Sequence, residues 1–290
     1  MIELANRYQL RNRYLFKGRL VMQTALHIGT GGKVTLSPSD SPVVLTPAGV
    51  PFIPGSSFKG ALRSTVEKLI PMLPEHAGLS TCSLINVDED TLKKMSRAEK
   101  DRLCPTIRQS DITQQRREHP ERVDKILDEP FCDTCRLFGS PYAASHVNIN
   151  DLYMPADSMS DIVQIRDGVA IDRDSERARD RLKYDFEVVP VGAAFDLEIT
   201  LENATKQDVQ LLCVGLSEYV HGFGIVGGKR SRGLGACKIE KLEVSSLVLT
   251  VDEPERSERL RNFLLNREFQ SVEPGKEFLD RHISSIFSQE

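Results

Sequence analysis

Apolar and polar residues alternate near the start of the chain, which is the pattern of a half-buried β-strand. The same alternation recurs at residues 195–201, and segments 146–154 and 236–244 indicate two further strands. Turn residues and polar loops separate these segments, so we predict short strands joined by helices. Within residues 14–28, one face of the first strand carries Leu20, Met22, Thr24, Leu26 and Ile28.

Two segments instead carry apolar residues at helical spacing. The first, PFIPGSSFKGALRSTVEKL, predicts a helix with Ser56 or Ser57 as its N-cap. Lys59 and Arg63 share the face opposite its apolar stripe, so we expect this face to be polar and accessible. The stripe consists of Phe58, Ala61, Leu62, Val66 and Leu69.

A second helix is predicted after Thr205, with Asp208 completing a capping box and Gly222 ending the helix. In order, the chain reads strand, helix, strand, long hairpin, strand, helix, strand. This is close to the β-α-β-β-α-β order of ferredoxin-like and RNA-recognition (RRM-like) folds. We therefore predict the α+β fold class, on a sheet of the kind that single-stranded RNA uses as a platform.

The pattern divides the chain into a core and two additions. We expect residues 1–71 and 140–250 to form the core, with residues 160–187 projecting from it as a hairpin with a charged tip. Residues 72–139 are highly charged and predict an insertion of short helices. Residues 251–290 predict two amphipathic helices, which would dock through Leu260, Phe263, Leu264, Phe278, Ile283 and Ile286.

Composition narrows the class of protein. The chain has 290 residues, 40% of them hydrophobic, so it can bury the core of one large domain or two small ones. No run of about 18 apolar residues predicts a membrane span, and no apolar signal core opens the sequence, so we expect a cytoplasmic protein. A net charge of −4 argues against a general nucleic-acid coat but leaves room for a local basic groove.

Four of the six cysteines suggest a metal site. Cys132 and Cys135 form a C-x-x-C pair, and Cys82 and Cys104 lie in the polar insertion. Four thiolates around one Zn²⁺ make a closed structural site, which an insertion with few apolar residues needs in order to fold. A redox pair or buried thiols are the alternatives, although no thioredoxin-like unit precedes the motif. His76 or His119 are possible substitute ligands, whereas Cys213 and Cys237 are expected in the core.

The segment HGFGIVGGKRSRGLG, residues 221–235, combines glycines with three basic side chains. Glycine lets a backbone approach a ligand, and successive free N–H groups can form an anion-binding concavity. The arginines add bidentate contacts to phosphate. The alternative is a tight turn with solvated charges.

Six short motifs occur in an order that resembles the RAMP superfamily, and more narrowly a backbone subunit (the Cas seven group) of a type III CRISPR effector complex. The resemblance covers residues 14–245. The motifs are LHIGTGG, SDSPV, FIPGSSFKGALRS, CRLFGSP, FEVVP at the end of the arginine-rich hairpin, and GIVGGKRSRGLG.

The resemblance implies an antiviral complex in which such subunits polymerise along a CRISPR RNA. The sheet face, first helix and glycine-rich loop would hold this guide, and the hairpin, or thumb, would wedge between bases. Target RNA paired to the guide would be cut at regular intervals, which makes the subunit a metal-dependent endoribonuclease. Its cleavage would depend on Mg²⁺ or another divalent metal and on an aspartate at the position of Asp40. Other effector subunits, including copies of this chain, would be its partners.

The resemblance and the charge pattern together predict the RNA contacts. Phe138 and Tyr142 could stack on bases, although Phe138 is better suited to the core. The expected RNA-binding residues are His27, Ser57, Lys59, Arg63, Arg166, Arg173, Arg181, Lys229, Arg230, Ser231 and Arg232.

Several alternatives stay open at this point. Ser-Asp-Ser-Pro around Asp40 is also an ordinary turn, and Asp172 and Asp174 are weaker catalytic candidates. The chain could be a non-catalytic RNA-binding scaffold. It could also be a guide-processing endoribonuclease of the same superfamily, with His27 or His221 as acid or base. A zinc-dependent small-molecule enzyme ranks last, because four cysteine ligands leave no open position.

Overall fold

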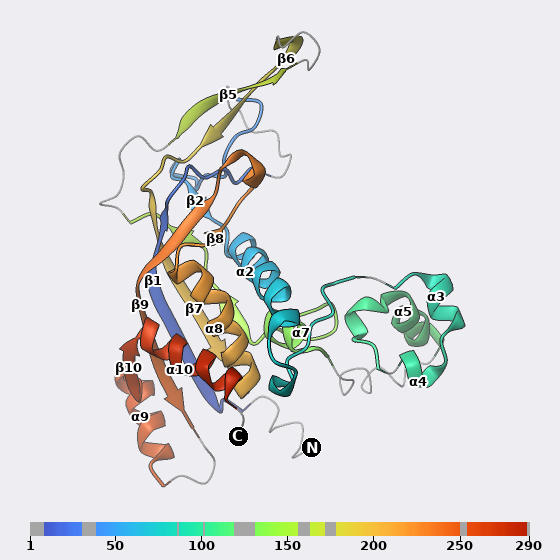
Figure 1. Cartoon of the computed structure of the whole chain (residues 1–290). Helices are drawn as coiled ribbons and strands as arrows, with labels where there is room; N and C mark the ends of the chain where they lie inside the picture. The colour runs from blue at the N-terminus through green and yellow to red at the C-terminus, as the bar shows by residue number, and fades with distance from the viewer. Residues whose placement is uncertain are drawn as a thin grey trace.

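An antiparallel sheet forms the centre of the body (Figure 1). β1 (Asn12–Met22) lies between β7 (Ala194–Glu202) and β9 (Ala236–Val248). β3 (Val147–Ile149) pairs with β7, and β10 (Ser271–Pro274) pairs with β9. The order β9-β1-β7-β3 is that of a ferredoxin-like β-α-β-β-α-β chain, which confirms the α+β class. The computed structural model describes residues 9–30, 39–85, 87–100, 102–118, 131–155, 163–171, 178–249 and 254–288.

The alternation predicted for β1 sets one face of the sheet in the core. Phe16 pairs with Ile199 on β7 and with Val244 on β9, and all three side chains are fully buried. Leu20 and Met22 continue the same buried face.

β1 ends at Met22, so the prediction of one strand through residue 28 was too long. The backbone N–H groups of Gln23 and Thr24 both donate to the carbonyl of Ala236, at 2.8 and 3.2 Å, and the chain turns away there. Leu26 then pairs separately with Val189 and remains buried.

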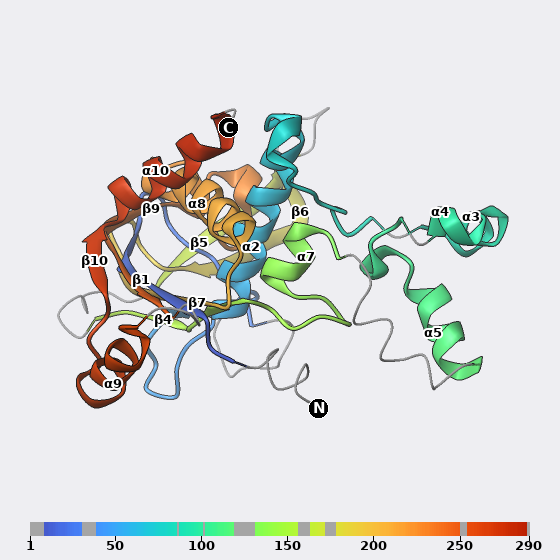
Figure 2. The same ribbon diagram turned by 90° about the horizontal axis from the view of Figure 1, so that it is seen from below.

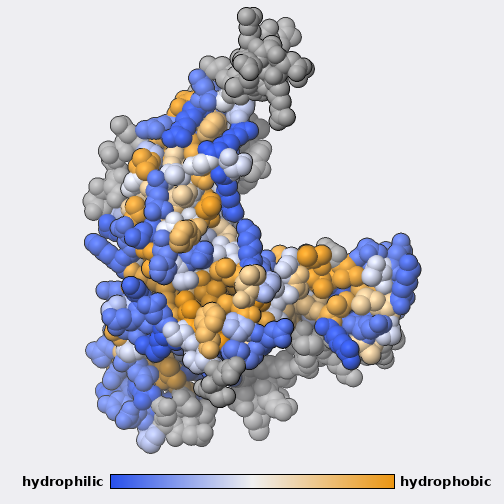
Figure 3. Space-filling model, in the orientation of Figure 1, coloured by the Kyte–Doolittle hydropathy of each residue, from blue (hydrophilic) through white to orange (hydrophobic). Residues whose placement is uncertain are grey.

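Helices α2 (Gly55–Leu69), α8 (Lys206–Val220) and α10 (Gly275–Phe287) lie on one side of the sheet (Figure 2). α2 and α8 approach closely because Gly215 has no side chain, and a Cβ there would lie 2.7 Å from Val66. Apolar residues gather over the middle of the body, and hydrophilic residues cover the C-terminal elements below it (Figure 3).

The predicted ends of α8 are confirmed. Thr205 and Asp208 form a reciprocal capping box, and Gly222 follows the helix with a φ of 84°. The predicted N-cap of α2 was wrong, because Pro54 occupies that position and no side chain caps it from there. Asp151 instead accepts the N–H of Gly55 at 2.8 Å.

A long hairpin extends away from the sheet at the top of Figure 1. It consists of β5 (Gln164–Ile171) and β6 (Ala178–Val188), paired antiparallel. A smaller pair, β2 (Phe52–Ile53) and β4 (Leu152–Tyr153), lies beside α2 and β3. Arg173, Asp172 and Asp174 lie outside the described residues, as does the side chain of Arg181.

Short helices, as predicted, make up the regular structure described between residues 72 and 139. Several of them lie to the right of the body in Figure 1. His119 lies outside the described residues. The helices are η1 (Ile70–Met72), η2 (Glu75–Ala77), α3 (Glu89–Lys94), α4 (Arg97–Lys100), η3 (Pro105–Ile107), α5 (Gln109–Glu118) and α7 (Asp133–Phe138).

The C-terminal helices lie on opposite sides of the sheet (Figure 2). Phe278 on α10 packs edge-on against Phe16 of β1, whereas Phe263 on α9 (Arg256–Asn266) joins a separate cluster with Leu247. Leu264 was predicted to dock α9 but is 57% exposed, because Phe263 occupies the buried position beside it. β10, between the two helices, was not predicted.

Candidate functional site

The loop that carries Asp40 lies against β6 at the base of the long hairpin. The N–H of Asp40 donates to Oδ1 of Asp185 at 2.7 Å, and the N–H of Asp185 donates back to Oδ2 of Asp40 at 3.3 Å. The N–H of Val43 donates to the carboxylate of Glu187 at 3.0 Å. Asp40 itself is exposed, so its carboxylate faces solvent from a loop that β6 holds in place.

His27 also contacts this loop. Its Nδ1 lies 2.8 Å from the carbonyl oxygen of Glu187, and its Nε2 lies 3.3 Å from the hydroxyl of Ser41. Burial, more than any other effect, lowers the pKa of His27, so the ring is neutral at neutral pH. A buried ring engaged at both nitrogens suits support of the loop better than phosphate contact, and the RNA-binding role of His27 stays a prediction.

The glycine-rich loop joins β8 (Gly224–Ile225) to β9 and contains the single turn η6 (Arg230–Arg232). The prediction that the N–H groups of this loop are free to bind an anion is wrong at several positions, because these groups donate to carbonyls of the chain. The N–H of Gly228 donates to His27, that of Gly235 to Ala25, and those of Arg232 and Gly233 bond within the loop. Gly227 serves close packing here, since a Cβ on it would lie 2.5 Å from the His27 carbonyl oxygen.

Two of the three basic side chains of this loop lie over aromatic rings of β6. Nζ of Lys229 is 4.8 Å from the ring centre of Phe186 and 5.8 Å from that of Tyr184. The guanidinium of Arg232 lies over Tyr184 at 5.4 Å and donates to its hydroxyl. Cation–π attraction of this kind ties the loop to the hairpin base. Gly168 lies opposite Tyr184, where a Cβ would collide with its ring.

The base of the hairpin has two faces of different chemistry. Directly paired residues of an antiparallel ladder point to the same side. Arg166 pairs with Phe186 and therefore lies on the face of the glycine-rich loop. Asp167 pairs with Asp185 and lies on the face of the Asp40 loop. The hairpin base thus carries basic and aromatic residues on one face and acidic residues on the other.

Lys59 and Arg63 belong to a different neighbourhood, around residues 135–147. Nζ of Lys59 donates to Ser145 at 2.8 Å and to the Val147 carbonyl at 3.0 Å. Burial is the largest effect that lowers the pKa of Lys59. Both side chains are half-buried, which corrects the expectation of an accessible polar face, and their phosphate contacts stay predictions that this packing does not favour.

Among the other predicted contacts, Arg230, Ser231, Arg232 and Arg166 are exposed and Ser57 is half-buried. Phe138 packs in the core, as expected, and the hydroxyl of Tyr142 lies 3.5 Å from the carbonyl of Gln109.

The open face of the sheet carries cross-strand ion pairs. Lys17 of β1 lies 3.2 Å from Glu198 of β7, and similar pairs join Arg13 to Glu202 and Arg19 to Asp196. None of the described side chains that β1 and β7 present on this face is aromatic. RNA-recognition sheets stack bases on such aromatics, so β1 and β7 lack the usual platform, and the nearest aromatic ring, that of Phe263 on α9, is covered by Arg13.

The four predicted metal-binding cysteines come together. The sulfur atoms of Cys82, Cys104, Cys132 and Cys135 all lie within 4.8 Å of one another, and those of Cys82 and Cys135 are 3.6 Å apart. Four sulfurs around one Zn²⁺ at about 2.3 Å would be about 3.8 Å apart, so the geometry fits a tetrahedral ion. Three of the cysteines are buried, and Cys82 is half-buried.

Two groups outside the cluster donate hydrogen bonds to one of its sulfurs. Arg63 donates to Sγ of Cys135 at 3.2 Å, and the hydroxyl of Thr106 lies at the same distance. Within the cluster, a hydrogen bond with Cys132 lowers the pKa of Cys104, whereas hydrogen bonds with Cys104 raise the pKa of Cys82 and Cys135. Thiolates are the form that binds metal, so the two donors to Cys135 suit a metal site.

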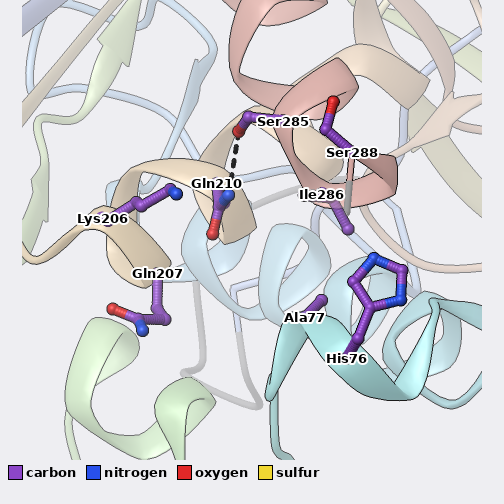
Figure 4. Close-up of a pocket in the computed structure, with 8 residues that line it drawn as sticks. All are labelled: His76, Ala77, Lys206, Gln207, Gln210, Ser285, Ile286 and Ser288. Carbon is purple, nitrogen blue, oxygen red and sulfur yellow. Dashed lines mark hydrogen bonds between the residues drawn. The ribbon is translucent and has the colours of Figure 1, made fainter. Parts of the chain in front are cut away.

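His76 lies away from the cluster and does not serve as a substitute ligand there. It lines a polar hollow of about 570 Å³ between η2, the start of α8 and α10 (Figure 4). Gln210 donates to Ser285 across this hollow at 2.9 Å. Cys213 and Cys237 are buried in the core, as expected.

Comparison with known proteins identifies the family. A family model described as the RAMP superfamily matches residues 19–238, which is most of the chain. The chain therefore belongs to the RAMP superfamily. No helix in the described part of it combines the length and apolar character that a membrane crossing requires.

Within the superfamily the chain is similar to proteins named CRISPR system Cms endoribonuclease Csm3. The protein from Streptococcus thermophilus is 23% identical over 234 residues, covering 80% of this chain and 89% of the relative. Those from Enterococcus italicus and Methanothermobacter thermautotrophicus are 46% and 36% identical over 59 and 61 residues. Each of these two alignments covers 20% of this chain, and they span 28% and 25% of the relatives.

Three residues of the site, Tyr184, Asp185 and Glu187, were missed at the level of sequence. They lie in the run YDFEV, which alternates aromatic and acidic residues and so indicates a strand with two chemically different faces.

Proposed function

We propose that the chain is a Csm3-like backbone subunit of a type III CRISPR effector complex, which binds a CRISPR RNA and cuts the target RNA paired to it. The observation that carries the proposal is the meeting of Asp40 and the basic glycine-rich loop on opposite faces of one hairpin base. The RAMP match and the names of the relatives support it. Other subunits, including further copies of the chain, would be its partners.

Guide binding would use the basic face of the hairpin base. Arg230, Ser231 and Arg166 are exposed beside Lys229 and Arg232, so phosphates of an RNA could reach them together. These contacts are independent of base identity, which suits a subunit whose sequence specificity comes from the guide. The open sheet face, with its ion pairs, would contribute little.

Cleavage would take place on the acidic face. Attack of a ribose 2′-OH on the adjacent phosphate forms a 2′,3′-cyclic phosphate and breaks the bond to the 5′-oxygen of the next nucleotide. Asp40, an exposed carboxylate in a fastened loop, would accept the proton of the 2′-OH, and water would protonate the leaving 5′-oxygen. Carboxylate oxygens at a solvent-accessible position also suit a partly hydrated Mg²⁺. Asp40 would hold such an ion, and the ion would neutralise negative charge on the phosphate.

The four-cysteine cluster is proposed as a structural Zn²⁺ site. The sulfur spacing and the closed set of four thiols support this assignment. Along with it we propose residues 72–139 as the zinc-bound insertion and residues 160–187 as the thumb. Residues 1–71 and 140–250 would form the core, and residues 251–290 a C-terminal addition.

Replacement of Asp40 tests the proposal. In a guide-loaded complex, Asp40→Ala should abolish regularly spaced cuts in Mg²⁺ while guide and target binding are kept, and chelator should abolish cutting by the wild type. Cutting that survives Asp40→Ala would leave the chain as an RNA-binding scaffold.

A further inference from the structure

The Asp40 loop is fastened to β6 at successive positions. Asp185 accepts the N–H of Asp40 at 2.7 Å, the N–H of Glu187 donates to Ser41 at 3.1 Å, and Glu187 accepts the N–H of Val43 at 3.0 Å. Glu187 is buried, so its contact anchors the loop to the body. Asp185 contacts Asp40 itself.

The contact between Asp40 and Asp185 is reciprocal. The Asp185 carboxylate holds the backbone of Asp40, while the Asp185 N–H holds Oδ2 of the Asp40 side chain at 3.3 Å. Asp185 is thus the residue of the hairpin that contacts both the backbone and the carboxylate of Asp40. Reactions that need aligned groups are sensitive to this kind of fastening.

A carboxylate at position 185 has a cost. Asp167 is its direct partner on β5, and like charges directly opposite each other destabilise an antiparallel pair. A charge-assisted bond from the Asp40 N–H offsets this cost. Departures from a local rule of this kind tend to occur at functional sites.

We propose that Asp185 is a positioning residue for target cleavage, which holds the Asp40 loop through its side-chain oxygen and acts through Asp40. The inference rests on the proposed function of Asp40. The group required at position 185 is a hydrogen-bond acceptor, and asparagine supplies one without the charge.

The test compares Asp185→Ala with Asp185→Asn in guide-loaded complexes at several Mg²⁺ concentrations. Asp185→Ala should lower the single-turnover cleavage rate by about ten- to a hundredfold, with target affinity kept. Asp185→Asn should stay within about threefold of wild type with an unchanged Mg²⁺ dependence. Asp196→Ala, which removes an acid from the open sheet face, should cut like wild type.

A second measurement follows the loop directly. Amide hydrogen exchange in residues 39–43 of the full chain should accelerate in Asp185→Ala and change little in Asp185→Asn. This readout does not require assembly of the complex, so it remains decisive if one variant assembles poorly.

Three results would overturn the inference. Wild-type rates in Asp185→Ala would show that the contact is dispensable. An equal loss of cleavage rate in Asp185→Ala and Asp185→Asn, together with a higher Mg²⁺ requirement, would show that the charge of Asp185 is needed and not its hydrogen bond to the loop. If Asp40→Ala cuts like wild type in the same series, the proposed function fails and the inference falls with it, whereas loss in Asp40→Ala alone contradicts only the inference.

Discussion

At the scale of single residues, Arg63 links helix α2 to the cysteine cluster. Its Nε lies 2.8 Å from Glu67 one turn along α2, and its other nitrogens donate to the Gly139 carbonyl and to Sγ of Cys135. Three acceptors hold one half-buried guanidinium. A planar group with this many donors cannot be replaced by lysine without losing contacts.

We therefore expect Arg63→Met to destabilise the protein by about 2 kcal/mol, because buried acceptors lose their donor. Bound zinc should be lost at lower chelator concentration than in wild type. Thermal unfolding and zinc release would measure both effects, with Lys68→Met as the control, since Lys68 is an exposed basic residue on the same helix.

Guide-RNA binding by Arg63→Met should keep the salt dependence of the wild type. The slope of the logarithm of affinity against the logarithm of salt concentration measures the number of phosphate contacts. If that slope is smaller by about one in Arg63→Met, while stability and zinc retention are unchanged, Arg63 contacts phosphate, as the sequence first predicted.

At the scale of elements, the start of α8 is held by a buried acid. Asp208 is fully buried, accepts the N–H and hydroxyl of Thr205 at 2.9 and 2.8 Å, and lies 3.0 Å from His146. Arg136 of α7 approaches it at 3.3 Å. Burial opposes ionisation, but the bonds from His146 and Thr205 outweigh it and lower the pKa of Asp208.

Asp208→Asn should lower the free energy of unfolding by about 1.5 to 3 kcal/mol at neutral pH. Because the folded pKa lies below the unfolded value of about 3.9, the charge stabilises the fold above that pH. The contribution is lost as pH falls through the folded pKa, so the difference between wild type and variant should begin to shrink below about pH 4 and disappear at still lower pH. Urea unfolding across pH measures this, and a constant difference down to the acid limit would contradict it.

Features that depend on residues close in sequence were predicted better than features that depend on residues far apart in sequence. The capping box of α8 depends on residues three apart and was predicted, whereas the partner at the start of α2, Asp151, is distant in sequence. The close sulfurs of Cys82 and Cys135 were expected from residue type. The contact of Asp40 with Asp185 and the hydrogen bond from Arg63 to Cys135 join segments that meet only in the folded chain. Neither could be predicted from local sequence.

At the scale of the whole molecule, the body and the residues around the cysteine cluster are stabilised differently. The sheet and its helices bury a continuous apolar core, whereas the three buried cysteines form a small cluster of their own. Such a cluster depends on its metal when few apolar residues surround it. Zinc removal should therefore unfold the residues around the cysteine cluster and leave the sheet and its helices folded.

Purified protein should contain one zinc per chain, measured by elemental analysis. Chelation or Cys104→Ser should make residues 82–131 sensitive to protease while the core, which includes Leu137 and Phe138 of α7, stays resistant. Cys237→Ala is the matched control, because it removes a buried cysteine outside the cluster and should keep the zinc. Protection of residues 82–131 in metal-free protein would contradict a structural zinc.

The central claim is that Asp40, held at the base of the hairpin, is responsible for cutting target RNA. The most direct measurement maps target cuts in guide-loaded complexes assembled from mixtures of wild-type and Asp40→Ala chains. Every cut should weaken in proportion to the fraction of variant, with cut positions and target binding unchanged. Cuts that keep their full intensity with Asp40→Ala alone would contradict the account.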